Sequence, residues 1–461
     1  MIPIGERINR LGKAARASGG PNPLDLIVAL LLLFVTARLA GEAFERMRQS
    51  PLIGEVLAGI LLGPMLLGLI DPDPTTELGA SLSVAANLGI LVLVLLAGIE
   101  LGREGLHQAF RERSMVVAMV EFFLPFAAGY ALGLSIGMTF AQALFLGTAL
   151  SVTALPVSVR ILLDLNLLHS RLGRAIVSVA LVNDLVAFAM LGLVLELTRI
   201  GGVVDGSTVA LVLAKNLIFL GLVYSVSLVL KESSRITRSG QTYMQTFLGK
   251  LRGQESGFAV AVAIALALGA GAELLGIHFA VGVFYGGILI TPRLMGRERF
   301  AKIRNAVSSV AFGFFTPIFF AFVGLNFAIA LGAWSLVVTV TAIAFLGKVL
   351  GGILGGYVAR FRGAPLLALG FGLNARGMME LLLAQVGLAA GIIGADLYSA
   401  LIVMTLVTTL STPIALKRLV RRFKASDVIP VAHEAPSEAP PDAEPTGGPV
   451  SGIREPGSGG V

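Results

Sequence analysis

The segment SVTALP (residues 151–156) interrupts an apolar run that otherwise extends over residues 138–163. A second segment, GLNARG (residues 372–377), interrupts the apolar run 364–389 in the same way. Backbone that leaves the helix is tolerated at membrane depth only where it is buried in protein or lines a water-filled cavity. Two interrupted spans in corresponding halves of a chain are typical of a transporter's binding site, with ordinary proline or glycine kinks as the alternative.

The composition places both segments in a membrane protein. Of 461 residues, 56% are hydrophobic and 14% are charged, whereas soluble domains contain about 45–50% apolar and about 25% charged residues. The mean hydropathy is +0.87. Apolar runs of about 20 residues recur along the chain, and a helix of that length crosses a bilayer. We therefore predict an all-α polytopic membrane protein whose surroundings are the lipid bilayer.

Several chemistries are excluded. The chain has no cysteine, so thiolate zinc sites, disulfides and cysteine nucleophiles are ruled out. Neither GxxxxGK[ST] nor HExxH occurs, which argues against ATP-driven transport and against zinc peptidases. The net charge of +7 comes from short clusters between apolar runs, so we predict no nucleic-acid partner. We expect no cofactor and no enzymatic activity.

The apolar runs predict about 13 transmembrane helices in one domain over residues 24–416. An N-terminal segment, 1–23, is expected to be partly disordered. A tail, 417–461, begins with a basic cluster and continues as a Pro-, Gly- and Glu-rich stretch that cannot bury enough apolar surface to order itself. The predicted spans are bounded by charge, Gly or Pro, and they are 24–43, 51–70, 83–101, 114–136, 138–163, 172–198, 207–230, 256–272, 275–291, 306–329, 333–357, 364–389 and 396–416.

Thirteen crossings give the chain a consistent sidedness. Nearly all loop Lys and Arg residues then fall on one side, and after the first span Arg199 alone lies in a loop on the other. The positive-inside rule makes the basic side cytoplasmic. We therefore predict a multi-pass protein of the cell (inner) membrane, with the N-terminus outside and the C-terminus in the cytoplasm. A twelve-span arrangement is the alternative, because the N-terminal segment is itself basic.

Asp184 is the strongest functional candidate. It lies in the middle of the predicted span 172–198, where a carboxylate costs roughly 2.5–3.5 kcal/mol on insertion scales. Burial disfavours the charged form of a carboxyl group, so this side chain can hold either a proton or a monovalent cation. That mutual exclusion is the central requirement of antiport. A structural ion pair is the alternative role, and neighbouring Asn183 is either an organiser of the site or a helix-packing amide.

Other intramembrane polar residues are assigned more broadly. Lys348 either neutralises Asp184 when no cation is bound or serves as a fixed counter-ion. Arg376 and Glu380 share one helical face and are expected to pair or to brace the break. Glu121 has no evident role. The remaining assignments are interfacial positions for Glu55, Glu100 and Lys215 and a helix-packing role for His278.

The two halves of the chain are related by spacing. Thr153 and Asn374 lie about 221 residues apart, and nearly the same offset carries Gly59 onto Gly282. This spacing indicates an inverted repeat of two six-span halves around one extra helix, although glycine is frequent in any membrane helix.

Ordered motifs along the chain resemble the cation:proton antiporter-2 family of sodium/hydrogen exchanger-like carriers. The matching stretches are QSPLIGEVLAGILLGP (49–64), LLAGIEL (95–101), TALPVSVRIL (153–162), FTPIFF through GL (315–325) and NARG with Glu380 (374–380). The resemblance implies two discontinuous crossing helices beside an acidic site, a core and a dimerisation subdomain, a homodimer, and elevator-like alternating access. It places the ion-binding carboxylate on Asp184, crossover polar residues on Thr153 and Asn374, and the core lysine on Lys348.

One departure from the family pattern affects stoichiometry. Electrogenic relatives carry two adjacent acids where this chain has Asn183-Asp184, and the asparagine version resembles electroneutral exchangers. Lys348 is nevertheless present, as it is in electrogenic relatives and in some potassium carriers that have a neutral residue before the acid. We therefore expect a secondary active antiporter of Na⁺ or K⁺ against H⁺, with its stoichiometry open. The site residues are Asp184, Asn183, Thr153, Ser151 and Asn374, and the charge-balancing residues are Lys348, Arg376 and Glu380. A cation channel or a non-exchanging sensor on the same fold is the alternative.

Overall fold

A computed structural model describes residues 23–109, 112–168, 170–200, 206–233, 243–244 and 255–423. Over these ranges the chain is helical and contains no strand, which confirms the predicted fold class. The predictions for nearly all of the N-terminal segment and for the tail beyond residue 423 lie outside the described residues.

The helices follow one another with short connections. They are α2 (Pro23–Arg46), α3 (Pro51–Leu62), α4 (Glu77–Ala109), α5 (Glu112–Ser135), α6 (Phe140–Ser151), α7 (Leu155–Asp164), α8 (Arg171–Ile200), α9 (Gly206–Ser233), α11 (Ser256–Leu274), α12 (Phe279–Leu289), α13 (Pro292–Met295), α14 (Arg297–Val310), a π-helical turn (Ala311–Phe315), α15 (Thr316–Leu325), a 3₁₀ turn (Leu331–Ala333), α16 (Trp334–Val358), α17 (Gly363–Gly372), α18 (Met378–Ala389) and α19 (Ala395–Val420).

Helix length separates two groups among the described residues. Nine helices are long and apolar enough to cross a membrane, and α3, α6, α12, α17 and α18 are apolar but shorter. The predicted spans 138–163 and 364–389 each consist of two short helices, as the interrupting segments indicate. The span predicted at 51–70 is helical only to Leu62, because the chain turns at Gly63 and Gly68. The total of thirteen transmembrane helices stays a prediction.

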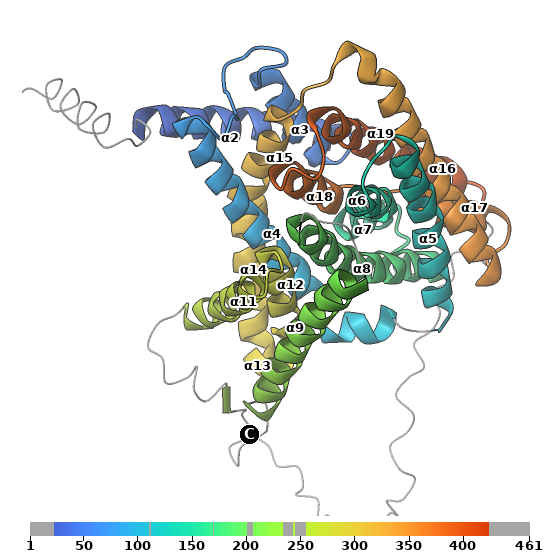
Figure 1. The fold of residues 1–461 in the computed structure, drawn as a ribbon. Helices are drawn as coiled ribbons and strands as arrows, with labels where there is room; N and C mark the ends of the chain where they lie inside the picture. Colours follow the sequence, from blue (N-terminus) through green and yellow to red (C-terminus); the bar gives the residue numbers. More distant parts are fainter. Residues whose placement is uncertain are drawn as a thin grey trace, which may run out of the picture.

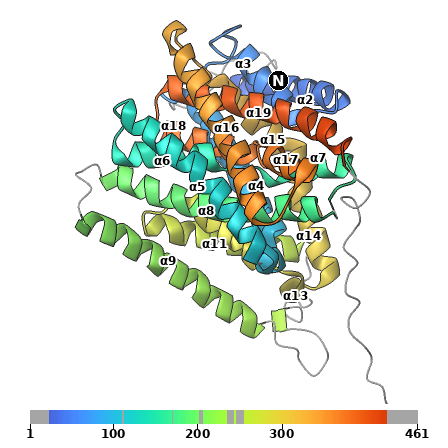
Figure 2. The ribbon, with the colours of Figure 1, turned by 90° about the vertical axis from the view of Figure 1, so that its right-hand side faces the viewer.

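The short helices lie at the centre of the bundle. Figure 1 shows α6, α7 and α18 together beside α8; α8 contacts α6 and α7, and α18 contacts α6. In both views α9 runs along the outside of the bundle (Figures 1 and 2). The arrangement therefore buries the interrupted helices and leaves α9 at the periphery, where Leu217, Tyr224 and Val229 are exposed.

Glycine contacts hold the two short helices α3 and α12 against neighbouring helices. A Cβ added at Gly59 of α3 would lie 1.9 Å from the carbonyl oxygen of Ala321 in α15. A Cβ at Gly287 of α12 would lie 2.8 Å from the Cα of Gly98 in α4. Small residues permit such backbone contact in membrane bundles, where dispersion replaces the hydrophobic effect as the packing force. The predicted repeat relates α3 to α12, and both are short.

Gly59→Ala is expected to destabilise the bundle by about 1–3 kcal/mol, because the added methyl group forces α3 away from α15. Thermal unfolding of the detergent-solubilised protein measures the effect. Gly221→Ala in α9 is the matched control, since a Cβ there meets no atom within 4 Å. Equal unfolding temperatures for the two variants would show that the α3–α15 contact contributes nothing.

Candidate functional site

The two interrupted helices cross at their breaks. Between α6 and α7 the backbone is extended at Val152 and Ala154, and between α17 and α18 it leaves the helix after Leu373. The amide of Ala154 donates to the carbonyl oxygen of Ala375 at 3.0 Å. Thr153 Oγ1 lies 3.1 Å from the carbonyl oxygen of Leu373. The polar backbone released by each break is thus partly satisfied by the other.

Arg376 donates hydrogen bonds to carbonyl groups at the C-terminal end of α6. Its Nη1 donates to the carbonyl oxygen of Ala149 at 3.0 Å and its Nη2 donates to that of Leu150 at 2.5 Å. The last carbonyls of a helix lack internal donors and carry partial negative charge, so a buried guanidinium is favourable there. Arg376 is fully buried. It therefore braces the break, which is one of its two expected roles.

Glu380 occupies the first turn of α18. Its Oε2 accepts the backbone N–H of Gly377 at 2.9 Å, and its Oε1 lies 3.8 Å from Arg376 Nη1. A carboxylate is favourable at a helix N-terminus for the same reason that a cation is favourable at the other end. Arg376 and Glu380 thus form an i, i+4 pair that also complements both helix ends.

Lys348 pairs with Glu121, and this corrects the sequence analysis. Both side chains are fully buried, and Lys348 Nζ forms an ion pair with Glu121 Oε1. Nζ also donates to Thr153 Oγ1 at 2.7 Å. The assignment of no role to Glu121 is therefore wrong, and in this structure Lys348 contacts Glu121 rather than Asp184.

Close packing between α5 and α16 brings the pair together. The glycines at positions 347, 351 and 355 of α16 face Pro125, Glu121 and Val117 of α5, where an added Cβ would lie 2.9–3.0 Å from the facing Cα atom. Small residues at every fourth position allow two helices to approach closely. The signal that could have identified the pair was this glycine spacing around Lys348, together with a glutamate one turn before Pro125.

Asn183 connects α8 to the same network. Its Nδ2 donates to Glu121 Oε2 at 2.7 Å and to Thr153 Oγ1 at 3.1 Å. Thr153 Oγ1 lies 2.9 Å from Glu121 Oε1, so its single hydrogen can be donated there or to the carbonyl of Leu373. Four side chains from three helices and one break are thus joined at the crossing.

Asp184 is buried but unpaired. Its carboxylate is 5% exposed, and its Oδ1 has no hydrogen-bond partner. Among the described residues, no basic side chain lies within 4.0 Å of it. Lys348, Glu380 and Glu100 act on it only through longer-range electrostatic interactions. Burying a carboxylate without a partner is costly, and a bound cation or proton removes that cost.

Unpartnered oxygens accompany Asp184 around the breaks. Asn374 is fully buried and neither atom of its amide has a partner, and Asn183 Oδ1 and Glu380 Oε1 are also unpartnered. Buried polar atoms are almost always hydrogen-bonded, so these atoms are available to a water molecule or an ion. Oxygen donors suit hard cations. Ser151, by contrast, bonds to the carbonyl of Gly147 at 2.7 Å within its own helix.

One further expectation is corrected, that of Glu55, and the contacts of Lys215 and His278 are added to it. Glu55 is 3% exposed and packs against Gly41 of α2, so it is not interfacial. Lys215 forms an ion pair with the buried carboxylate of Glu196. His278 caps α12, because its Nδ1 accepts the N–H of Ala280 at 3.3 Å.

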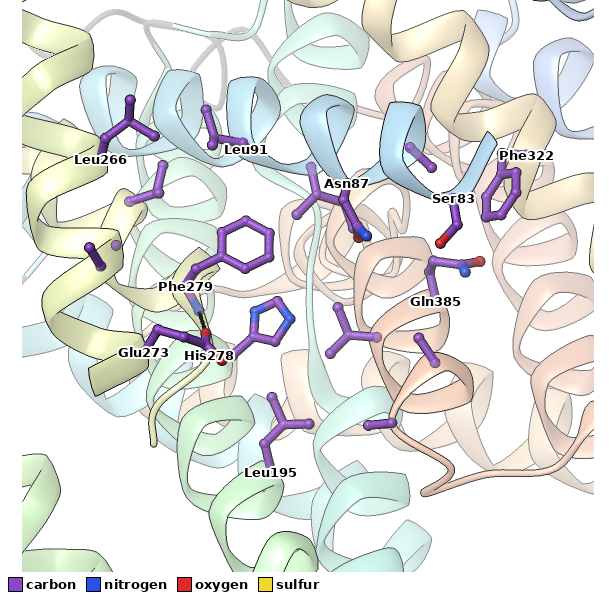
Figure 3. A pocket seen from close by; sticks show the side chains of 18 of the residues that line it. Ser83, Asn87, Leu91, Leu195, Leu266, Glu273, His278, Phe279, Phe322 and Gln385 are labelled. Atoms are coloured by element: carbon purple, nitrogen blue, oxygen red, sulfur yellow. Dashed lines mark hydrogen bonds between the residues drawn. The ribbon is translucent and has the colours of Figure 1, made fainter. Parts of the chain in front are cut away.

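A cavity of about 750 Å³ opens between α4, α8, α11, α12, α15 and α18. Its walls are largely apolar, and in Figure 3 the side chains of Asn87 and His278 point toward its centre. Leu195 and Thr198 of α8 line it. Counting back along the same helical face from Thr198 gives Leu195, then residues 191 and 188, then Asp184. The cavity therefore lies against the same face of α8 that carries the unpaired carboxylate further along the helix.

An aromatic pair lies between the cavity-lining part of α8 and Asp184. Phe188 of α8 stacks on Phe284 of α12 with ring centroids 4.2 Å apart, and both rings are fully buried. Phe188 lies one turn beyond Asp184, on the cavity side. In this conformation the carboxylate is separated from the cavity.

Comparison with known proteins gives consistent matches. A family model described as "sodium/hydrogen exchanger, transmembrane" matches residues 29–422. The chain is 30% identical to the Na⁺/H⁺-K⁺ antiporter GerN of Bacillus cereus over 85% of this chain and 96% of that protein. It is 30% identical to the Na⁺/H⁺ antiporter NhaS4 of Synechocystis over 86% of this chain and 98% of that protein.

A solved structure supports the fold. The sodium proton antiporter MjNhaP1 from Methanocaldococcus jannaschii at pH 8 superposes with a TM-score of 0.65 and 16% identity, covering 86% of this chain and 98% of the other. At that identity the likeness extends to the fold alone.

Proposed function

We propose, because this chain belongs to the sodium/hydrogen exchanger family, that it is a secondary antiporter that exchanges a monovalent cation for protons across a membrane. Two relatives matched over nearly their whole length are named as antiporters of Na⁺ and H⁺, one of them also of K⁺. The cation is accordingly Na⁺ or K⁺. The chain is not an enzyme, and its apolar helices cross the membrane several times.

One observation carries the proposal. A single buried carboxylate, Asp184, lies without an ion-pair partner in a helix that contacts both α6 and α7, on either side of one break. Every other buried ionisable group joined to the crossing already has a partner of opposite charge. Asp184 is therefore the group that a transported ion meets.

The cation and the proton compete for Asp184. Deprotonated, its carboxylate attracts a cation, and the oxygens of Asn374 and Asn183, with backbone carbonyls at the breaks, replace part of the hydration shell. Protonated, it has no charge and does not hold a cation. Exchange follows when the occupied carboxylate faces each side of the membrane in turn.

Alternating access requires a route on each side. The 750 Å³ cavity supplies one route, closed in this conformation by Phe188 and Phe284. A smaller cavity of about 240 Å³ lies at the opposite ends of the helices and is lined by Arg48, Arg160 and Lys417 among others. Movement of the α8 body against α4 and α12, which are fixed to each other by Gly98 and Gly287, would open one route as the other closes.

Orientation and assembly follow from the same proposal. The basic side, with Arg48 and Lys417, faces the cytoplasm, as does the C-terminus, and the N-terminus lies outside the cell membrane. A core subdomain carries the crossing, and a second subdomain forms a homodimer interface through which two copies of the chain associate.

Competition between the cation and the proton for the carboxylate can be tested by transport measurements. Everted vesicles that contain the protein are acidified, and Na⁺, K⁺ or Li⁺ is added at several pH values while acridine-orange dequenching reports proton release. Lower pH is expected to raise the cation concentration needed for half-maximal rate, because protons occupy the carboxylate, and saturating cation is expected to restore the maximal rate. Dequenching that does not depend on any of the cations would contradict antiport, and single-channel currents in planar bilayers would identify a channel.

A further inference from the structure

A basic pocket lies at the ends of the helices opposite the large cavity. Its volume is about 240 Å³, and three cationic side chains line it, Arg48, Arg160 and Lys417. They come from three separate elements, which are the turn between α2 and α3, α7 and α19. Positive side chains repel a transported cation, so the proposed exchange does not explain why they gather here.

The protein neutralises this positive charge only in part. Arg160 Nη2 donates to Glu45 Oε1 at 2.7 Å, so these two side chains form a neutral pair. Among the described residues, Arg48 and Lys417 form no ion pair, and Asp164 is the one carboxylate that lines the pocket. Two cations and one carboxylate leave a single positive charge, which one phosphodiester group would neutralise.

Arg48 occupies a backbone position that favours glycine. Its φ is 58°, and the amide of Gln49 donates to the carbonyl oxygen of Phe44 at 2.9 Å, which makes Arg48 the left-handed residue that ends α2. Glycine is the usual residue at such a position because a Cβ meets the following carbonyl oxygen there. Retaining an arginine at this energetic cost indicates that its side chain has a use.

The pocket also holds a hydrogen-bond acceptor without a donor. Gln49 lines the pocket, and its Oε1 is buried and has no hydrogen-bond partner. An ionised phosphodiester has only acceptor oxygens and cannot satisfy this atom, whereas a hydroxyl group can donate to Gln49 Oε1 or to the carboxylate of Asp164. The lining therefore suits a phosphodiester that carries hydroxyl groups.

An apolar rim and the depth of the pocket indicate that the ligand is a lipid. The rim consists of Met47, which is 66% exposed, and Ile414, which is 45% exposed. Arg160 and Asp164 follow Leu155, the first residue of α7, by five and nine residues. The helical rise places them about 8–14 Å from the crossing, and half of the hydrocarbon core of a bilayer is about 15 Å. The pocket thus lies near the level of the lipid phosphates.

We propose that this pocket binds the headgroup of an anionic glycerophospholipid whose phosphodiester carries hydroxyl groups, as in phosphatidylglycerol. Arg48 and Lys417 contact the phosphate, and Gln49 and Asp164 accept hydrogen bonds from the hydroxyls. The acyl chains leave along the apolar rim. A lipid bound in this way joins the α2–α3 turn to α7 and α19, and it stabilises the arrangement of these elements that forms the site. The site does not depend on the proposed antiport.

Titration of the detergent-solubilised full-length protein with phosphatidylglycerol that carries a fluorescent acyl chain tests the site. Lys417→Gln is expected to weaken binding about tenfold or more, the loss expected for one charge-assisted hydrogen bond. Lys302→Gln is the matched control, because it makes the same change at an exposed position of α14 outside the pocket. Equal affinities of the two variants would overturn the proposal, since binding would then respond to surface charge in general or to neither lysine.

Arg48→Gly separates a role in binding from a role in folding. The variant is expected to bind the labelled lipid about tenfold or more weakly. Its unfolding temperature without lipid is expected to be unchanged or higher, because glycine adopts the left-handed conformation without strain. Wild-type affinity in Arg48→Gly would overturn the proposal, and a lowered unfolding temperature alongside that affinity would show that Arg48 serves the turn alone.

Unlabelled competitors identify the chemistry of the ligand. Phosphatidylethanol has the same charge as phosphatidylglycerol but no headgroup hydroxyl, and phosphatidylcholine has no net negative charge. Both are expected to displace the labelled lipid about tenfold less well than phosphatidylglycerol does. Equal competition by phosphatidylethanol would overturn the role of the hydroxyls, and equal competition by phosphatidylcholine would overturn the role of the charge. Soluble sn-glycerol 3-phosphate offers phosphate and hydroxyl groups without acyl chains, so competition by it at the same concentrations as phosphatidylglycerol would overturn the assignment to a lipid.

Discussion

Asp184→Asn is expected to reduce cation-dependent proton flux to the level of vesicles without the protein. The amide has nearly the same shape, but it has no charge to attract a cation and no proton that titrates. Neither the cation nor the proton can therefore be carried across the membrane. The side chain is buried and unpaired in the wild-type protein. Replacing it by a neutral group leaves no opposite charge stranded, and we therefore expect unchanged insertion and an unchanged gel-filtration profile.

Asp25→Asn is the matched control, because it makes the same chemical change at an exposed position in the first turn of α2. Acridine-orange dequenching with Na⁺ and K⁺ in everted vesicles compares the two variants. Residual cation-dependent flux in well-inserted Asp184→Asn would show that another group binds the ion, and the assignment of the site would then be wrong.

Arg376→Leu is expected to lower the free energy of unfolding by about 3–5 kcal/mol, the range found when one member of a buried ion pair is removed. The change strands Glu380 as a buried charge, and it leaves the carbonyls of Ala149 and Leu150 without their donors. Thermal unfolding in detergent measures the loss, and reduced yield from the membrane is a second readout.

A double variant identifies the physical cause. Arg376→Leu combined with Glu380→Gln removes the stranded charge while the glutamine oxygen can still accept the N–H of Gly377, so part of the lost stability should return. Arg46→Leu, whose guanidinium is exposed and pairs with Glu42, is expected to change stability by no more than about 0.5 kcal/mol. If Arg376→Leu changed the stability no more than Arg46→Leu does, the contacts of Arg376 across the crossing would contribute nothing to the stability of the protein.

Much of the architecture could be predicted from the chain alone, because a membrane restricts the choices. Apolar runs must be helical where no water satisfies the backbone, and the segments at residues 151–156 and 372–377 could only be tolerated inside protein. The structure places both breaks at one crossing, joined by the hydrogen bond from Ala154 to Ala375. Asp184 was likewise selected by the cost of burying a carboxylate, and its burial is observed.

The ion-pair partner of Lys348 could not be predicted from the sequence. Lys348 and Glu121 are 227 residues apart in the chain, and sequence order gave no reason to prefer Glu121 over Asp184 as the lysine's partner. The preference arises from the close approach of α5 and α16 along the glycines of α16. Glu55 was misplaced for a related reason, since its exposure depends on α2, which covers it.

The amino-acid sequence by itself determined the helical membrane fold, the two breaks and the candidate residue for ion binding, because each follows from the local cost of polar atoms in an apolar solvent. Only the tertiary structure decided which charges neutralise each other. Electrostatic pairing depends on distances between segments that are remote in the chain, and those distances are set by helix packing. The charge left over at Asp184, on which the proposed exchange depends, is therefore a property of the folded bundle.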